Sequence, residues 1–349
     1  MKEAKASGLE GVVAALTALS HVDGEKGELI IAGESVEKLA GARSFEQVTA
    51  ALWREPQVDF GPARMWAFSR LSTLGGALDA ANGMDAIRGA VGQLPEDATA
   101  LQVTAAVAVF GAAWARKRAG QQPIAPDPRL GHAADVLRMV TGSAPEALAR
   151  ALDSYLVSVS DHGMNASTFT ARVIASTQSD LVSSITGAIG ALKGPLHGGA
   201  PGPVLDMLDA VEVPEQAVGW LEREVAAGRR IMGMGHRIYR VRDPRAAVLE
   251  AAVERLERAG ITSRRLSLAR AVERAATEVL ARRYPDRGLQ ANVEFYTAVL
   301  LDTVGLPREL FSVLFAMGRA AGWCAHVAEQ RATGKLIRPA SEYVGPRPS

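Results

Sequence analysis

The sequence is poor in cysteine, with one residue of this type, Cys324, among 349. A single thiol excludes an intramolecular disulfide and a zinc site built from cysteines. The chain also has no HExxH helix, no GxxxxGKS/T phosphate loop and no GxSxG nucleophile elbow. We therefore expect no metal ion, and we do not expect a zinc protease, a P-loop nucleotide hydrolase or an α/β-hydrolase.

The sequence also has no marked excess of positive or negative charge. The 39 Lys and Arg residues face 38 Asp and Glu residues, which gives a net charge of +1 at pH 7. This balance does not favour nucleic acid or an anionic membrane surface as a partner. The longest run of low polarity, at about 103–115, is too short to span a bilayer, and the first residues lack the apolar stretch of a signal peptide. We expect a cytoplasmic protein without a membrane segment.

Strand patterns are scarce, and helical periodicity dominates the chain. The best strand pattern is at 28–32, between Gly27 and Gly33. Strands and helices do not alternate, which argues against a parallel sheet. Apolar residues recur at helical spacing over about 214–227, 267–280, 292–304 and 309–330. We predict an all-α fold with at most a minor β-hairpin near the N-terminus.

Two helix starts carry capping signals. Ser143 and Glu146 have the spacing of a capping box, and Pro145 would then lie in the first turn. Asp243 precedes Pro244 in a similar way, which predicts a second helix that opens at this proline.

His162, His197 and His236 lie among glycines or small residues, where backbone can approach a ligand closely. A lone histidine beside glycine is more often a turn residue than a catalyst, so spacing alone leaves both alternatives open. The glycine pair at Gly233 and Gly235 lacks the third glycine of a dinucleotide fingerprint and follows no clear strand. A dinucleotide cofactor is therefore disfavoured.

Three charged residues stand where a charge needs a partner. Arg245 lies in the first turn of a predicted helix, where it is either a solvated charge or part of an anion site. Arg319 lies in the middle of an apolar helical segment, so it needs an anionic partner. Glu294 opens another segment that is apolar on nearly all sides. It is either a charge partner of the helix terminus or a base whose pKa is raised by burial.

Five blocks of the sequence, in order, carry a family resemblance. They are DHGMNASTFTARVIAST (161–177), GALKGPLHGGAP (190–201), IMGMGHRIYRVRDPRA (231–246), NVEFYTAVLLDTVGLP (292–307) and FAMGRAAGWCAHVAEQ (315–330). With these blocks the chain resembles the citrate synthase family over nearly its whole length. The resemblance implies a two-domain, nearly all-helical fold. The large domain would comprise 1–198 and 306–349, and the small domain, 199–305, would close over the substrates.

The same resemblance implies an acyltransferase of the tricarboxylic acid cycle that condenses acetyl-CoA with oxaloacetate and water to give citrate and CoA. It also implies a homodimer whose active site is shared between subunits. No resident cofactor is implied, because the CoA thioester is a substrate. Two alternatives stay open. One is a 2-methylcitrate synthase, since one methylene of propionyl-CoA changes binding by only about 1–3 kcal/mol. The other is a catalytically silent paralogue that binds CoA or dicarboxylates.

Individual roles follow by match to the family motifs. His197 corresponds to the histidine that hydrogen-bonds the acetyl-CoA carbonyl, His236 to the one that polarises the keto group of oxaloacetate, and Glu294 to the base. The usual base of the family is aspartate, so the carboxylate here lies one methylene farther from the backbone. The implied oxaloacetate ligands are His162, Asn165, Arg245, Arg319 and, from the other subunit, Arg338. The implied CoA contacts are Met232, Gly233, Met234, Gly235 and Arg240, with Asn292 as a weaker candidate.

Overall fold

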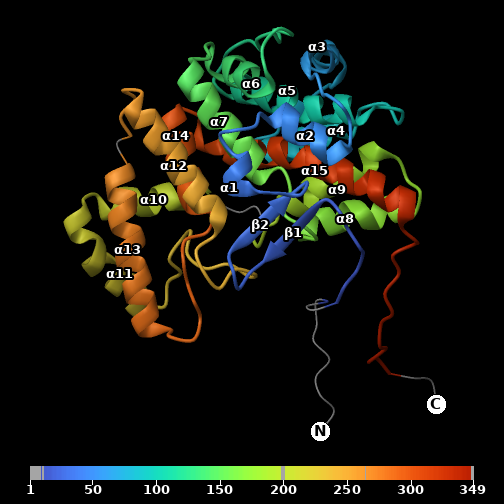
Figure 1. Ribbon diagram of the computed structural model, residues 1–349. Coiled ribbons are helices and arrows are strands. Elements are labelled where there is room, and N and C mark those ends of the chain that lie inside the picture. The colour runs from blue at the N-terminus through green and yellow to red at the C-terminus, as the bar shows by residue number, and fades with distance from the viewer. Residues whose placement is uncertain (1–8, 10–11, 198–200, 264, 347–349) are drawn as a thin grey trace.

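The computed structural model describes residues 9, 12–197, 201–263 and 265–346 of the chain. Gly198, Gly199 and Ala200, which belong to the second family block, lie outside the described residues, and so does the predicted domain boundary at 198/199. The described part forms fifteen α-helices and one small β-sheet (Figure 1). The predicted all-α fold with a minor N-terminal hairpin is confirmed.

The elements ahead of the first family block are β1 (Ser20–Asp23), β2 (Glu28–Ile31), β3 (Glu34–Ser35), α1 (Val36–Leu39), α2 (Phe45–Trp53), α3 (Gly61–Ser69), α4 (Gly83–Val91), α5 (Ala100–Arg118), α6 (His132–Thr141) and α7 (Glu146–Val159). The later helices are α8 (Ala166–Ser176), α9 (Leu181–Leu192), α10 (Pro201–Val211), α11 (Ala217–Ala226), α12 (Pro244–Arg258), α13 (Leu266–Arg283), α14 (Val293–Val304) and α15 (Phe311–Thr333). Single 3-10 turns are η1 (Leu71–Thr73), η2 (Ala77–Asp79), η3 (Pro214–Gln216) and η4 (Arg308–Leu310). The helices predicted at 214–227, 267–280, 292–304 and 309–330 correspond to α11, α13, α14 and α15.

The sheet is a hairpin extended by a two-residue third strand. Its strands pair antiparallel in the order β1-β2-β3. Leu29 and Ile31 are buried while Glu28 and Ile30 are half-buried, which is the period-two pattern of a strand with one face on the core. The strand predicted at 28–32 ends at Ile31, because Ala32 and Gly33 adopt positive φ values of 49° and 88° and turn the chain toward β3.

The two predicted helix starts differ in outcome. Asp243 is the N-cap of α12, as predicted, and its Oδ1 accepts a backbone N–H of the first turn at 3.0 Å. The capping box predicted for Ser143 is wrong, because α7 begins at Glu146 after Pro145 and no side chain caps it. Ser143 belongs to the turn that follows α6, where its carbonyl accepts the hydroxyl of Thr141 at 2.8 Å.

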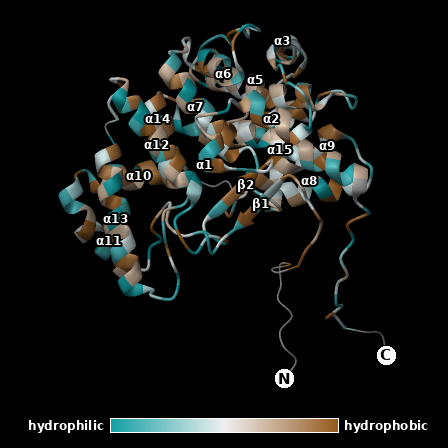
Figure 2. Ribbon diagram, in the orientation of Figure 1, coloured by the Kyte–Doolittle hydropathy of each residue, from teal (hydrophilic) through white to brown (hydrophobic). Residues whose placement is uncertain are grey.

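Two long helices, α5 and α15, form the centre of the core. All residues from 103 to 115 in α5 are buried. The segment Arg308–Ala332, which overlaps α15 up to its last residue but one, is long and apolar enough to cross a membrane, but 89% of its apolar window is buried inside the protein. Figure 2 shows hydrophilic and hydrophobic residues alternating along α11 and α13, as in helices that bury one face. The central helices α5 and α15 are therefore buried on nearly all sides, whereas α11 and α13 bury one face.

Helices α10, α11 and α13 gather on one side of the molecule, and α12 and α14 lie between them and the rest (Figure 1). Both α12 and α14 pack against α7, and α14 also packs against α10. All five belong to the predicted small domain, and the division into two domains stays a prediction. Residues 334–346, after α15, and residues 12–19, ahead of β1, run away from the helices on the same side (Figure 1).

A buried histidine opens α6. His132 is fully buried between the rings of Phe45 and Phe60, at centroid distances of 5.2 and 4.6 Å. Among the described residues, neither of its ring nitrogens has a hydrogen-bond partner. Burial, and then the charge of Arg64, hold the pKa of His132 well below its ordinary range. The folded protein therefore keeps this ring neutral where the unfolded chain would protonate it.

We expect His132→Phe to reduce the loss of stability on acidification. A histidine protonates near pH 6.5 in the unfolded chain, so the wild-type free energy of unfolding should fall as the pH drops below that value. One such group contributes about 1.4 kcal/mol per pH unit at most. Denaturant midpoints between pH 7.5 and 5 measure the slope, with the exposed His21→Gln as control. Identical slopes for wild type and His132→Phe would contradict this account.

Candidate active site

His197 follows α9 and contacts the first turn of α8. Its Nε2 lies 3.2 Å from the backbone nitrogen of Ser167 and 2.8 Å from the Ser167 Oγ. A backbone N–H can only donate, so Nε2 accepts this hydrogen bond and the neutral ring carries its proton on Nδ1. Burial, and then the charge of Arg319, lower the pKa of His197 to about 4. At neutral pH the ring is therefore an uncharged N–H donor.

Ser167 is itself held by its neighbours. Asn165 is the N-cap of α8, and its Oδ1 accepts the backbone N–H groups of Ser167 and Thr168, each at 3.1 Å. Trp323 of α15 donates its Nε1–H to the Ser167 Oγ at 3.1 Å. Asn165 thus orients the amide on which His197 depends, and its predicted contact with oxaloacetate stays a prediction.

His236 has the opposite tautomer. Its Nδ1 accepts the backbone N–H groups of Ile238 and Tyr239, at 3.0 and 3.1 Å. The proton of the neutral ring must therefore reside on Nε2. Burial, and then the charge of Arg245, lower the pKa of His236 to about 4. This ring is a second uncharged N–H donor at neutral pH.

His162 lies beside His236, with 5.6 Å between the ring centroids. It is buried, and its Nε2 lies 3.1 Å from the hydroxyl of Tyr239. Burial, and then the charges of Arg245 and Arg319, hold the pKa of His162 well below its ordinary range. All three predicted site histidines are therefore neutral at neutral pH. The charges of Arg245 and Arg319 contribute to the lowered pKa values of these rings.

Arg245 lies in the first turn of α12 with its guanidinium buried. It donates from Nε and Nη2 to the two carboxylate oxygens of Asp243, at 3.0 and 2.7 Å. Burial alone would lower the pKa of Arg245, but the charge and hydrogen bonds of Asp243 raise it above its ordinary value. Asp243 also accepts the backbone N–H of Val293 at 3.2 Å. One carboxylate thus caps α12, fixes the guanidinium and ties α12 to α14.

Arg319 is buried in the middle of α15. Its Nε donates to the carbonyl of Val159 at 2.6 Å, but its Nη2 has no hydrogen-bond partner among the described residues. Burial lowers the pKa of Arg319 to about 10. The group is therefore still charged at neutral pH and keeps an unused donor, which suits the binding of an anion.

Glu294 is the second residue of α14 and is half-buried. Its backbone N–H donates to the Oδ1 of Asn292 at 3.0 Å, and the Nδ2 of Asn292 donates to the carbonyl of Gly235 at 2.8 Å. Burial, Asp243 and Tyr239 have larger effects on the pKa of Arg245, and the charge of Glu294 also raises it. The predicted base therefore lies in the same electrostatic environment as the predicted substrate ligands, on a helix joined to the loop of His236.

The loop of the predicted CoA contacts pairs with the chain ahead of α14. Met234 forms an antiparallel bridge with Ala291, and Gly233 and Gly235 have positive φ values of 72° and 85°. A Cβ at Gly233 would lie 2.9 Å from the ring of Phe295, so this close approach requires glycine. The contacts of CoA with Met232, Gly233, Met234, Gly235, Arg240 and Asn292 stay predictions.

Arg338 is not brought to the other site residues within one chain. It is exposed in the segment after α15, and the preceding residue, Ile337, donates its backbone N–H to Ser176 Oγ at 3.0 Å. Ser176 ends α8, whereas Asn165 and the histidine cluster, formed by His162, His197 and His236, lie at its start, roughly 15 Å away along the helix axis. The chain itself therefore does not place this arginine at the cluster.

Four positioning residues were not among the predicted site residues: Ser167, Tyr239, Asp243 and Trp323. Asp243 was recognised only as a helix cap, although it also fixes Arg245. Ser167 could have been found, because an N-capped helix start such as that at Asn165 offers free backbone N–H groups. The other two have no local signal, because their contacts join distant parts of the chain.

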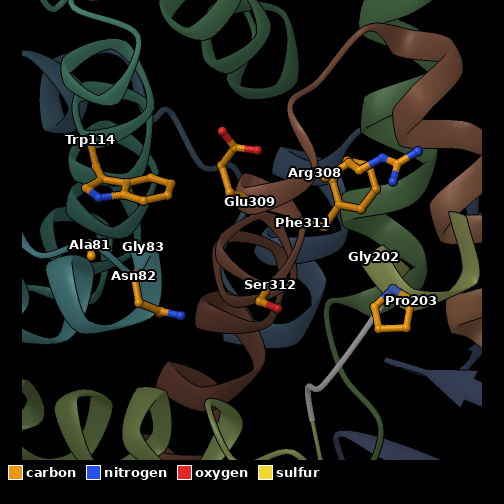
Figure 3. Close-up of a pocket in the computed structure, with 10 residues that line it drawn as sticks. All are labelled: Ala81, Asn82, Gly83, Trp114, Gly202, Pro203, Arg308, Glu309, Phe311 and Ser312. Carbon is orange, nitrogen blue, oxygen red and sulfur yellow. The ribbon is translucent and has the colours of Figure 1, made fainter. Parts of the chain in front are cut away.

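A cavity of about 220 Å³ lies away from the predicted site residues. It is lined by Ala81, Asn82, Gly83, Trp114, Gly202, Pro203, Arg308, Glu309, Phe311 and Ser312. Figure 3 shows Trp114 on one side and Phe311, Gly202 and Pro203 on the other. Arg308 at its edge is paired with Asp206 and Asp209. None of the predicted site residues lines this cavity, so it is not the site of the histidine cluster.

One group on the hairpin has the composition of a metal site. The ligand atoms of His21, Asp23 and Glu28 lie within 4.8 Å of one another. Asp23 is already used by the turn, because its Oδ1 accepts the backbone N–H groups of Glu25 and Lys26, each at 3.0 Å. The turn therefore accounts for the position of this carboxylate without an ion.

Comparisons with known proteins agree with the resemblance. A family model described as citrate synthase, C-terminal domain, matches residues 8–340. The chain is 41% identical over 356 residues to putative citrate synthase 2 of Mycobacterium tuberculosis, covering 98% of this chain and 93% of that protein. It is 37% identical over 361 residues to 2-methylcitrate synthase of the same organism, covering 97% and 90%. A solved citrate synthase of Thermoplasma acidophilum, in ternary complex with carboxymethyl coenzyme A and oxaloacetate, has a TM-score of 0.88 and 25% identity, covering 98% of this chain and 96% of that chain.

We expect the rings of His197 and His236 to stay neutral down to about pH 5, with protons on Nδ1 and Nε2 respectively. Both expectations follow from the backbone donors and from pKa values of about 4. Nitrogen-15 NMR of histidine-labelled protein distinguishes the tautomers, and His197→Gln and His236→Gln assign the signals. Ser167→Ala is the matched control, because it keeps the backbone amide and should keep the tautomer. Titration near pH 6.5, or a proton on Nε2 of His197, would contradict the assignment.

Proposed function

This chain belongs to the citrate synthase family, and from that premise we propose that it condenses acetyl-CoA with oxaloacetate and water to give citrate and free CoA. The observation that carries the proposal is the grouping of two neutral N–H donors, His197 and His236, with two buried guanidinium groups, Arg245 and Arg319. Neutral donors suit carbonyl oxygens, and guanidinium groups suit the carboxylates of a dianion.

The first step is removal of a proton from the methyl group of acetyl-CoA by the carboxylate of Glu294. The proton of a thioester methyl group is very weakly acidic, so the enolate must be stabilised as it forms. His197 provides this stabilisation when its Nδ1–H donates to the thioester oxygen. General-base help of this kind contributes about a hundred- to ten-thousand-fold to the rate.

The second step forms the carbon–carbon bond. The Nε2–H of His236 donates to the keto oxygen of oxaloacetate and makes its carbon more electrophilic, while Arg245 and Arg319 hold the carboxylates. The enolate carbon attacks this carbon, and the keto oxygen takes up one proton to become the hydroxyl group of citryl-CoA, which balances the proton that Glu294 removed. Water then attacks the thioester carbonyl, the C–S bond breaks, and the sulfur leaves as the CoA thiol. Fixed geometry of the two substrates supplies much of the rate.

We further propose a homodimer in which each site receives Arg338 from the other subunit. The support is the position of this arginine, which is exposed and lies near the end of α8, whereas the site residues of its own chain lie at the start of that helix. A large and a small domain, a cytoplasmic location, the CoA contacts of the glycine loop and the absence of a resident cofactor belong to the same proposal. The higher identity to a protein named as a citrate synthase favours acetyl-CoA over propionyl-CoA as the substrate.

Release of free thiol tests the proposal directly. The purified protein is mixed with acetyl-CoA, with and without oxaloacetate, and in parallel with propionyl-CoA. We expect thiol release that requires oxaloacetate and is faster with acetyl-CoA at equal concentration. Faster release with propionyl-CoA would make the protein a 2-methylcitrate synthase. No turnover alongside normal oxaloacetate binding would make it a silent paralogue.

Glu294→Gln should lower kcat by about a hundredfold or more while the Kd for oxaloacetate stays within about twofold, because the base acts on the other substrate. Thiol release gives kcat, and calorimetry gives the oxaloacetate Kd. The exposed Glu309→Gln, which also replaces a carboxylate by an amide, is the control and should keep wild-type kcat. Wild-type turnover by Glu294→Gln would reject the role of this carboxylate.

Mixed dimers test the shared site. Arg338→Ala and His197→Gln should each be inactive alone, but a mixture should recover up to one working site per heterodimer, which combines an intact His197 with the partner's intact Arg338. Thiol release is measured before and after subunit exchange, and exchange is verified with differently tagged chains. Exchange without recovery would show that each chain uses its own arginine.

A further inference from the structure

Helix α7 contacts all three helices that carry the charged site residues. It packs against α12, α14 and α15, on which Arg245, Glu294 and Arg319 lie. Tyr155 lies on this helix and is fully buried. Its hydroxyl has no hydrogen-bond partner among the described residues. A buried polar group of this kind requires an explanation, because desolvation without a partner is costly.

The other buried tyrosines in the described part of the chain use their hydroxyls. Tyr239 lies 3.1 Å from Nε2 of His162, and Tyr296 donates to Glu273 Oε2 at 2.7 Å. Tyr155 is therefore the exception, and not an example of a general tolerance for unpaired phenols in this core.

The hydroxyl of Tyr155 is a hydrogen-bond donor in the electrostatic environment of the charged site residues. Burial raises the pKa of Tyr155 above its ordinary value, against the opposing charges of Arg319 and Arg245, so the phenol stays protonated. The charge of Glu294 also acts on this group. The three charged groups that act on Tyr155 are thus the predicted base and two of the predicted substrate ligands.

A second unpaired donor lies in the same region. The guanidinium of Arg319 is held at Nε by the carbonyl of Val159, which leaves its Nη2 buried without a partner among the described residues. Two buried donors, one of them cationic, are both satisfied by an anion with two acceptor oxygens. A carboxylate has this chemistry, whereas a single water molecule would leave the cation without an ion-pair partner.

We propose that Tyr155 is a substrate-binding residue whose hydroxyl, together with Nη2 of Arg319, donates to one carboxylate of the keto dicarboxylate. The inference rests on the proposed function and adds a ligand that no family motif indicated. It also explains why the hydroxyl is unpaired in the protein alone, since its partner arrives with the substrate.

The test compares Tyr155→Phe with the matched control Tyr296→Phe, which removes an equally buried hydroxyl that already has a protein partner. For Tyr155→Phe we expect the Kd and the KM for oxaloacetate to rise roughly tenfold to a hundredfold, as for loss of a hydrogen bond to a charged group. Its melting temperature without ligand should stay equal or rise, because no bond is lost. Tyr296→Phe should lower that melting temperature and leave the Kd unchanged.

The outcomes separate this inference from the proposed function. If wild type neither binds oxaloacetate nor releases thiol, the proposed function fails. If wild type does both and Tyr155→Phe binds oxaloacetate equally well, the function stands and the role of Tyr155 is rejected. A fall in kcat with an unchanged Kd would also reject it, because the hydroxyl would then act on Glu294 and not on the dicarboxylate.

Discussion

The chemistry of this site depends on the fixed direction of three backbone N–H groups. Those of Ser167, Ile238 and Tyr239 point at imidazole nitrogens, and a backbone amide cannot reverse its role as a donor. They therefore set the tautomers of His197 and His236, and burial keeps both rings neutral. Two cationic rings beside the buried arginines would repel them. Neutral rings deliver hydrogen bonds to carbonyl oxygens without that repulsion.

The surrounding charges are balanced except at the position where a dianion would bind. Arg245 is paired with Asp243, and the buried Arg172 is paired with Glu329 at 2.6 Å. Next to His162, Asp161 accepts from the Nε2 of His326 at 3.2 Å. Arg319 alone of the buried arginines at the site has no ion pair among the described residues. Breaking a buried ion pair costs far more free energy than losing an exposed one. These paired groups therefore stabilise the structure around Arg319, which keeps a donor for an anion.

The family blocks and the helical period predicted the fold class, the helices of the C-terminal half and, apart from Arg338, the histidines and arginines that gather at the site, because these signals are carried by neighbours in sequence. The tautomer of His197 was not predictable, since it depends on an amide 30 positions away. The contact of Tyr239 with His162 spans 77 positions and has no local signal. Local rules also failed where two turns compete: Ser143 had the right spacing for a cap, but Pro145 occupies the N-cap position.

The N-terminal hairpin joins both sides of the site, which limits how the site can open. Ser20 Oγ accepts the backbone N–H of Gly163, beside His162, at 3.0 Å. Directly after the other end of β1, the carbonyl of Gly24 accepts the backbone N–H of Arg240, in the loop of His236, at 2.9 Å. A Cβ at Gly24 would lie 2.3 Å from the carbonyl oxygen of Ile238, so the hairpin and the loop touch without space between them. Asn292 and Asp243 also tie this loop to α14. Any movement of the predicted small domain must therefore break the bonds of the loop to α14, its contact with the hairpin, or the bond of the hairpin to Gly163.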